Sequence, residues 1–305
     1  MSKFNNQVVR CAVCNKLVKQ TVMMSSNSFG FPDLDGRPAG MMREAMVHFI
    51  NICPNCGYAH GVLDLLYFNA KEIVNSEEYQ RLRKELPNET AKKFYLAGYI
   101  EECNNEPAKA YQHYRHAAWM YDDSGHIELA KKCREKSIAC LDQLDHLIND
   151  VLALYIDMKR RIGAFDDALK IIEEKEESFK GTDKEIWLEL EKELCLKKDD
   201  KVHNYQEVYA ISVAKVQEYI PTLVAERLDE LIEESEEIVD ELKKLIEEKK
   251  AAIKALELGK ISEKEYKEIE KNIAKKNKEL TERRREVNKQ IKEHKEICEK
   301  HKKAN

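Results

Sequence analysis

The sequence predicts a mainly α-helical protein with a small β-rich module at the N-terminus and an antiparallel helical hairpin at the C-terminus. Of the 305 residues, 36% are charged but only ten are Gly and six are Pro, a composition that favours long helices. Closely spaced cysteine pairs occur only in the first 60 residues. After residue 220, apolar residues recur at alternating spacings of three and four, as in packed helices. These changes divide the chain into segments 1–68, 69–200 and 201–305.

Composition and charge exclude several classes of protein. The net charge of −5 gives no overall reason to expect nucleic-acid binding. No apolar run is long enough to span a membrane, and the first residues lack the apolar core of a secretory signal. Nine cysteines are an odd number, and five of them are scattered through helical sequence. That usage suits a reducing cytoplasm and one metal site, so we expect a cytoplasmic protein without a membrane segment.

The first segment, 1–68, contains two Cys-x-x-Cys pairs, Cys11–Cys14 and Cys53–Cys56. Four thiolates in two tight pairs suit a tetrahedral structural Zn²⁺ site, which leaves no open position for chemistry. We expect each pair to lie on a tight turn, here called a knuckle, and Gly57 to supply the positive φ of the second one. The sequence therefore predicts one Zn²⁺ bound by Cys11, Cys14, Cys53 and Cys56.

Other residues beside these pairs have weaker claims. His48 and His60 are the alternative ligands nearby, but four thiolates already complete a tetrahedron. Arg10 and Lys16 border the first pair and could partly neutralise the net charge of −2 that four thiolates leave on Zn²⁺, although simple solvation explains them equally well.

Short strands are predicted around the metal site. The β-branched and apolar stretches Val8–Cys11 and Leu17–Met24 flank the first cysteine pair. Residues Met41–Ile52 lead into the second pair, and we expect them to form a strand as well.

A turn-rich loop, residues 25–40, separates these strands. Loops of this length inside a compact unit are usually functional or mobile. We expect Asp33 and Asp35 to order the loop by pairing with Arg37, Arg43 or nearby backbone N–H groups. The alternative is an enzyme site lined by Asp33, Asp35 and Arg37.

The second segment, 69–200, is predicted to be a run of helices, with Asn88 as an N-cap. Small residues at Gly98, Ala110 and Ala117 have the spacing of a tetratricopeptide repeat, in which two antiparallel helices pack closely. Further segments that resemble part of this repeat begin at Gly125 and Gly163, and the one at Gly125 is the weaker. The alternative is an irregular helical bundle with the same close contacts.

Two further groups in this segment are open to a chemical reading. His113 and His116 share one helix face, so a second metal site is a minor alternative to ordinary contacts between helices. The remaining helical cysteines and both tryptophans fit core packing: Cys103, Cys133, Cys140, Cys195, Trp119 and Trp187. The sequence has no phosphate loop, nucleophile elbow or His-Glu-x-x-His motif, so no catalytic residue is predicted.

The last segment, 201–305, is predicted to be a long helix and a coiled-coil hairpin. Pro221 suggests a kink or a helix start. A heptad seam runs to Leu256, with weak positions at Ser235 and Lys249. Gly259 then ends the helix, and Ser262 opens another with a capping box. The seam residues are Leu228, Leu231, Ile238, Leu242, Leu245, Ala252, Leu256, and then Tyr266, Ile269, Ile273, Leu280, Val287, Ile291 and Cys298.

Charge favours an antiparallel arrangement of the two arms. Residues 226–248 contain eleven acidic and three basic side chains, whereas residues 271–303 contain thirteen Lys or Arg and six Glu. An antiparallel hairpin lays the acidic arm beside the basic arm, whereas a parallel dimer would stack like charges.

The N-terminal part of the chain contains the motifs Cys11-x-x-Cys14, Pro32-Asp33-Leu34-Asp35-x-Arg37-Pro38 and Cys53-Pro54-x-Cys56-Gly57-Tyr58. With these motifs, this part of the chain resembles an uncharacterised bacterial family, domain of unknown function 2225. The resemblance covers about residues 8–180. It implies a paired-knuckle zinc region joined to tetratricopeptide-like helices, but no agreed activity. The hairpin lies outside it.

Three functions are consistent with these features. We favour a zinc-binding interaction scaffold, with no enzymatic activity, that contacts a protein partner or a second copy through the helical repeats and the coiled coil. The first alternative is a nucleic-acid-associated factor that uses the ribbon and the basic arm. Nucleic acid is the less favoured partner because the acidic arm screens the basic one over about 8–10 Å. The second alternative is an enzyme with its site at the 25–40 loop.

Overall fold

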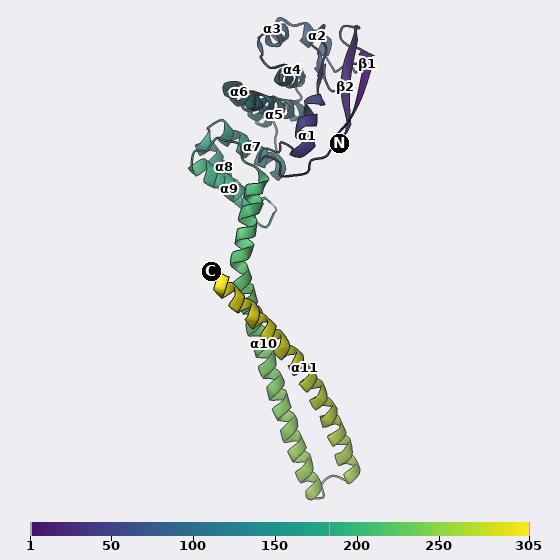
Figure 1. The fold of residues 1–305 in the computed structure, drawn as a ribbon, viewed down its shortest axis with the longest axis vertical. Coiled ribbons are helices and arrows are strands. Elements are labelled where there is room, and N and C mark those ends of the chain that lie inside the picture. The colour runs from purple at the N-terminus through teal and green to yellow at the C-terminus, as the bar shows by residue number, and fades with distance from the viewer. Residues whose placement is uncertain (1, 183, 305) are drawn as a thin grey trace. The chain divides into compact units, whose positions relative to one another are not determined.

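A computed structural model describes residues 2–182 and 184–304, with side chains left out for residues 217–221 and 299–304. The chain forms two compact units, residues 1–211 and residues 212–305 (Figure 1). The predicted fold class is confirmed: the protein is mainly helical, with two small antiparallel sheets near the N-terminus and a long helical hairpin at the C-terminus.

The N-terminal β structure consists of two separate two-stranded sheets. Strands β1 (Lys3–Arg10) and β2 (Leu17–Ser25) flank the first knuckle, as predicted, and pair antiparallel. Strand β1 begins at Lys3 rather than at the predicted Val8 and ends before Cys11. Strands β3 (Asn51–Ile52) and β4 (Ala59–His60) do the same around the second knuckle. The side chain of Asn51 joins the sheets, because it bonds to the backbone N–H and C=O of Thr21 at 3.0 Å and to the carbonyl of Gly61 at 2.8 Å.

The predicted strand at residues 41–52 is wrong for most of its length. Residues Gly40–Ala45 form helix α1, and Met46–His48 form a 3-10 turn, η1. Only Asn51–Ile52 is a strand. The helix buries Ala45, and the turn buries Met46 in the main core, so packing of these two side chains outweighs the β propensity of the segment.

Helices occupy most of the chain from residue 70 to the end of the first unit. Ser76 and Asn88 cap α3 and α4 with side-chain oxygens that accept backbone N–H bonds, and Asn88 is the N-cap that the sequence predicts. The helices are α2 (Ala70–Asn75), α3 (Glu77–Glu85), α4 (Glu89–Cys103), α5 (Pro107–Asp123), α6 (Ile127–Leu141), α7 (Asn149–Arg161), α8 (Phe165–Phe179) and α9 (Glu185–Leu196).

Three connections between helices have the same backbone conformation. The links α4–α5, α5–α6 and α7–α8 each contain three residues, and the middle residue has a positive φ: Asn105, Gly125 or Gly163. In each link the following N–H bonds back to a carbonyl five residues earlier at 2.9–3.0 Å, which is the Schellman arrangement. This repetition agrees with the repeat-like segments in the sequence, while the tetratricopeptide assignment itself stays a prediction.

Close packing of α4 against α5 depends on Gly98. A Cβ there would lie 3.2 Å from the Tyr114 ring and 3.3 Å from the Ala110 carbonyl. The strands and the first helices share one core, in which Cys11 and Cys53 pack in the same cluster as Tyr58, Phe94 and Trp119. Of the helical cysteines predicted to be buried, Cys103 is exposed and the other three are buried.

The second unit is an antiparallel helical hairpin. Helix α10 (Tyr205–Glu257) begins in the first unit, so the chain is already helical well before Pro221, whose side chain lies outside the described part. Gly259 has a φ of 63°, and Ser262 and Glu265 form the predicted capping box at the start of α11 (Glu263–Ala304).

Contacts across the hairpin confirm that its arms run in opposite directions. Glu234 pairs with Arg283 at 2.8 Å, and Lys249 pairs with Glu270 at 3.2 Å, so later positions on α10 meet earlier ones on α11. The buried seam contains Leu231, Ile238 and Val287. The two weak seam positions have partners across the arms, since Ser235 bonds to the Asn288 side chain at 3.3 Å. Among the described helices, none combines the length and the apolar character that crossing a membrane requires.

Candidate metal centre

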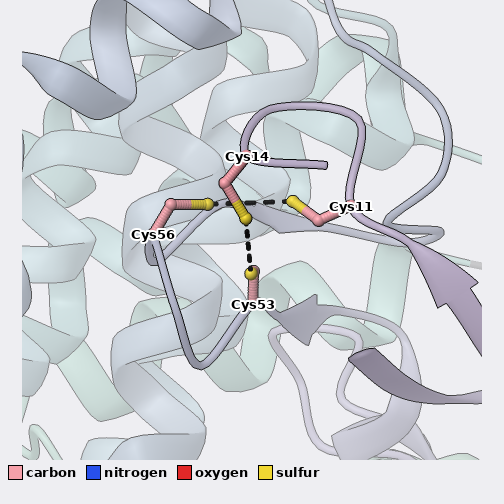
Figure 2. A group of neighbouring side chains, drawn as sticks. All are labelled: Cys11, Cys14, Cys53 and Cys56. Carbon is pink, nitrogen blue, oxygen red and sulfur yellow. Dashed lines mark hydrogen bonds between the residues drawn. The ribbon is translucent and has the colours of Figure 1, made fainter. Parts of the chain in front are cut away.

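The four predicted cysteine ligands come together in the folded chain (Figure 2). Their sulfur atoms all lie within 4.8 Å of one another, and the Cys11–Cys56 and Cys14–Cys53 sulfur pairs are each 3.7 Å apart. A tetrahedral metal with bonds of about 2.3 Å to sulfur requires sulfur separations of about 3.8 Å. The cluster could therefore hold one metal ion.

The two knuckles have the same backbone geometry. In the first, Asn15 N–H bonds to the Cys11 carbonyl at 2.8 Å, and Cys11 N–H bonds to the Lys16 carbonyl at 2.9 Å. In the second, Gly57 N–H bonds to the Cys53 carbonyl at 2.8 Å, and Cys53 N–H bonds to the Tyr58 carbonyl at 2.8 Å. Gly57 has a φ of 87°, as predicted, and Asn15 has a φ of 59°. Asn is the residue other than Gly that most readily adopts this conformation.

Helix α3 holds the second knuckle by four consecutive carbonyls. The Arg83 guanidinium donates to the carbonyls of Pro54, at 2.8 Å, and Asn55, at 3.2 Å. Gln80 donates to the Cys56 carbonyl at 3.0 Å, and the buried Tyr79 hydroxyl donates to the Gly57 carbonyl at 2.8 Å. One face of one helix therefore fixes the position of the second pair of sulfurs.

The surroundings of the thiols shift their pKa values in different directions. Burial raises the pKa of Cys11 and, more strongly, that of Cys56. Burial also acts to raise the pKa of Cys53, but hydrogen bonds from the backbone N–H groups of Cys56 and Asn55 and from the Cys56 and Cys11 thiols together lower this pKa to about 7. Donors aimed at a sulfur favour the thiolate, which is the form that binds metal.

The alternative ligands and the neighbouring cations lie elsewhere. His48 and His60 are not members of the cysteine cluster among the residues described. Arg10 donates to the Asn15 carbonyl at 3.3 Å, so it supports the first knuckle, and Lys16 takes part through its backbone carbonyl. Arg83 was not predicted to contribute, because nothing in the sequence indicates that α3 packs on the second knuckle.

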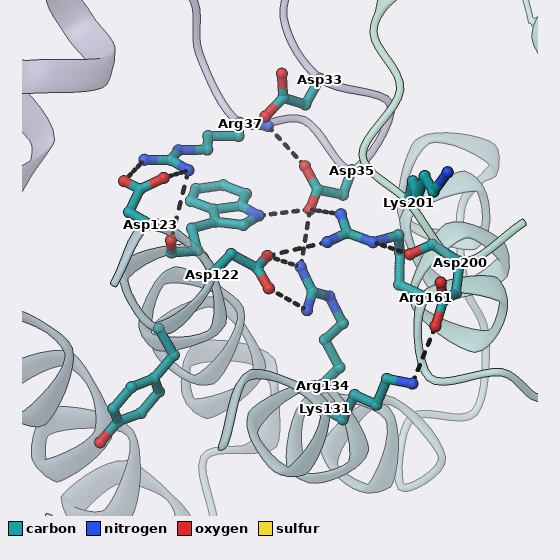
Figure 3. Close-up of polar contacts among 12 residues, drawn as sticks. Asp33, Asp35, Arg37, Asp122, Asp123, Lys131, Arg134, Arg161, Asp200 and Lys201 are labelled. Carbon is teal, nitrogen blue, oxygen red and sulfur yellow. Dashed lines mark hydrogen bonds and ion pairs between the residues drawn. The ribbon is translucent and has the colours of Figure 1, made fainter. Parts of the chain in front are cut away.

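The 25–40 loop is held in the first unit by a buried polar network (Figure 3). Asp35, which is 2% exposed, accepts a hydrogen bond from the Trp119 indole at 2.6 Å. Arg134 and Arg161 approach the same carboxylate at 3.9 and 3.8 Å, and both also pair with Asp122. The loop carboxylate therefore lies where α5, α6 and α7 meet.

The prediction for the loop's ion pairs is partly confirmed. Asp33 pairs with Arg43 at 2.8 Å, and Asp35 accepts the Arg37 backbone N–H at 3.3 Å. The Arg37 guanidinium, however, pairs with Asp123 rather than with either loop carboxylate. Burial and the Asp35 charge raise the pKa of Asp33. Each of the three side chains suggested for an enzyme site is thus occupied by a partner inside the unit.

The two histidines of α5 do not form a metal site in the described residues. His116 packs against aromatic rings, with centroids 4.8 Å from Trp119 and 5.4 Å from Phe94, and burial lowers its pKa well below the usual value. His113 lies 3.4 Å from the Glu101 carboxylate. His116 is therefore a neutral core residue, whereas His113 lines a cleft that is described below.

Comparison with known proteins gives no match to this chain among family models, curated proteins or solved structures. The resemblance to domain of unknown function 2225 therefore rests on the residues of this sequence alone and stays a prediction.

Proposed function

We propose that this chain is a zinc-containing interaction protein that associates with a second copy of itself through the C-terminal hairpin. The zinc assignment is supported by the donor set and its geometry. Four thiolates at tetrahedral spacing favour Zn²⁺ or iron–sulfur chemistry, and closed Cys₄ sites are typical of structural zinc. The metal would hold the two knuckles together and would leave no position for a substrate.

The observation that carries the interaction function is a second apolar stripe on α10. Ile232, Val239, Ile246 and Ile253 recur at every seventh position, immediately after the seam residues Leu231, Ile238, Leu245 and Ala252. Three members remain exposed, at 36% for Ile232, 56% for Ile246 and 37% for Ile253. A seam between only two helices needs two apolar positions in each heptad, whereas a helix inside a larger bundle uses three. The stripe is therefore suited to contact a further helix.

The charges beside the stripe favour a second copy of α10 in antiparallel orientation. Residues 226–241 carry nine acidic side chains and one basic, whereas residues 243–257 carry five lysines and three glutamates. An antiparallel pairing centred near Leu242 brings the acidic half of each helix against the lysine-rich half of the other. It also places Ile232 opposite Ile253 and Val239 opposite Ile246. Two hairpins paired in this way would form a four-helix bundle.

Full-length protein with Ile232, Ile246 and Ile253 changed to Gln tests the proposal. Six half-exposed isoleucines at about 1 kcal/mol each support the paired state, so we expect the triple variant to be monomeric where the unsubstituted chain is dimeric. Light scattering after size-exclusion chromatography measures the mass. The matched control is Leu223→Gln with Ile297→Gln, which changes exposed apolar residues outside both the stripe and the seam. A monomeric unsubstituted chain at high concentration, or a dimeric triple variant, contradicts the proposal.

Metal analysis tests the zinc assignment separately. We expect one zinc per chain in protein purified without added metal, and none after Cys53→Ser. Iron in place of zinc would contradict the assignment without affecting the hairpin proposal.

A further inference from the structure

A cleft of about 430 Å³ opens between the N-terminal β structure and helices α4 and α5. Its walls come from β2, the segment around η1, β4 and the chain that follows it, and the facing sides of the two helices. Phe49, Ile50, Ala97 and Ile100 give it a mostly apolar lining. The volume falls in the range of sites that take small organic molecules. The cleft lies apart from the cysteine cluster, none of whose residues line it.

One buried carboxylate interrupts the apolar lining. Glu101 on α4 is 8% exposed, and its Oε2 atom is buried without a hydrogen bond. The nearest basic atom is Nε2 of His113, at 3.4 Å, but this contact lacks hydrogen-bond geometry. Nδ1 of His113 is also buried without a partner. A buried carboxylate oxygen without a donor is costly, so this end of the cleft has unused capacity for a hydrogen-bond donor.

The charge of the lining selects a cation. Glu101 is the one acidic residue that lines the cleft, and no Lys or Arg is among the lining residues described. Burial and the charge of Lys93 lower the pKa of His48, so this histidine adds no positive charge near neutral pH. Phe49 adds an aromatic ring to the lining, which suits a cation with an apolar body.

We propose that this cleft binds a small organic cation, a primary ammonium on an apolar body, with the ammonium donating to Glu101 and the apolar part lying against α4 and the β2 wall. The carboxylate then gains the donor that it lacks, and the apolar walls lose their contact with water. An organic anion of the same size would meet Glu101 with no Lys or Arg among the described lining residues to offset the repulsion. A neutral alcohol could donate one hydrogen bond but would not offset the buried charge.

Three probes of matched shape test the proposal on the full-length, metal-loaded protein: 2-phenylethylammonium, 2-phenylethanol and phenylacetate. Calorimetric titration at neutral pH should show the ammonium binding about tenfold more tightly than the alcohol, and phenylacetate binding more weakly than both. Glu101→Gln should weaken ammonium binding about tenfold and change alcohol binding less than about twofold. Glu89→Gln is the matched control, because Glu89 is on the same helix with a side chain that is 79% exposed.

A second measurement keeps the test decisive if Glu101→Gln does not fold. In the unsubstituted protein, the ammonium probe should shift the NMR ring signals of His48, His60 and His113, which line the cleft, and not those of the exposed His146. Equal affinity for the three probes, or ring signals that do not move, would overturn the proposal. Neither result bears on the hairpin, because the cleft and the stripe share no residue.

Discussion

The two cysteine knuckles and the 25–40 loop fix irregular backbone in the same unit by different means. The knuckles bring four sulfurs to the spacing of a tetrahedral metal site, and the loop places one carboxylate between two arginines and an indole. A metal–thiolate centre can offset a large loss of chain entropy through a few strong bonds. The loop depends instead on many partners from three helices, so it is stable only where those helices already pack. The knuckles therefore leave a position that a metal ion could fill, whereas the loop carboxylate is already held by side chains of the first unit.

The largest expected effect is the loss of the metal. Cys53→Ser should reduce the metal content from one ion per chain to none and loosen residues 1–68, because structural zinc contributes about 10–16 kcal/mol to such sites. Most helix content should remain. Metal analysis, circular dichroism and hydrogen exchange measure these quantities, and the 25–40 loop should keep more protection than the knuckles. Equal loss of protection in both regions would erase the distinction between them.

Asp35→Ala should have the next largest effect. It leaves Arg134 and Arg161 with one carboxylate fewer in a buried site, so we expect the free energy of unfolding to fall by about 3 kcal/mol while the metal content stays unchanged. Chemical denaturation measures the change. Asp35→Asn is the matched variant. Its amide oxygen can still accept the hydrogen bond from the Trp119 indole, so the free energy of unfolding should fall by less. A variant that keeps its stability but loses an activity would instead favour an enzyme site at the loop.

Gly57→Ala tests whether the two knuckles differ in how well they tolerate a substitution at the position with positive φ. Alanine there is forced into a positive φ, and its Cβ meets the Arg83 side chain, so we expect the free energy of unfolding to fall by about 2 kcal/mol. Asn15→Gly at the equivalent position should change stability by less than about 0.5 kcal/mol. Because Arg83 also donates to the Pro54 and Asn55 carbonyls, the double variant Gly57→Ala with Arg83→Ala is compared with Arg83→Ala alone. If Gly57→Ala costs less stability in the Arg83→Ala background than in the unsubstituted protein, the clash accounts for that part of the loss. Similar losses at Gly57 and Asn15 would contradict the asymmetry.

Arg43→Gln should have the smallest effect. Its pair with Asp33 is partly open to solvent, with 35% of the arginine side chain exposed, and exposed pairs are worth about 0.5 kcal/mol. If Arg43→Gln lowered the free energy of unfolding as much as Asp35→Ala, the partly exposed Arg43–Asp33 pair would contribute as much to stability as the buried Asp35 carboxylate.

The comparison also explains what could be predicted from the sequence. The cysteine ligands follow from spacing alone, because each pair is local and its chemistry is specific. The hairpin follows from heptads, a capping box and charge. The partners of Asp35 could not be predicted, because Trp119, Arg134 and Arg161 lie about 85 to 125 residues away and become neighbours only when three helices pack.

Two local features differ from what the sequence predicts, for separate reasons. The composition of residues 41–52 predicts a strand, but burial of Ala45 and Met46 favours a helix and a 3-10 turn. The end of α4 has no Gly to indicate it in the sequence, because Asn105 adopts the positive φ instead.

The hydrogen bonds from α3 to four successive carbonyls of the second knuckle have a consequence for the order in which the metal centre folds. The α3 side chains that hold the carbonyls of the second knuckle lie within 30 residues of it, at positions 79, 80 and 83. The sulfurs of the first knuckle lie 39 or 45 residues from the sulfurs that they face. Contacts between nearby residues form faster than distant ones. We expect the second knuckle and α3 to fold first as a two-sulfur half-site that captures the ion, after which the first knuckle closes over it. Pulse-labelling hydrogen exchange during refolding should show protection of Gly57 before that of Asn15, and the reverse order would exclude this pathway.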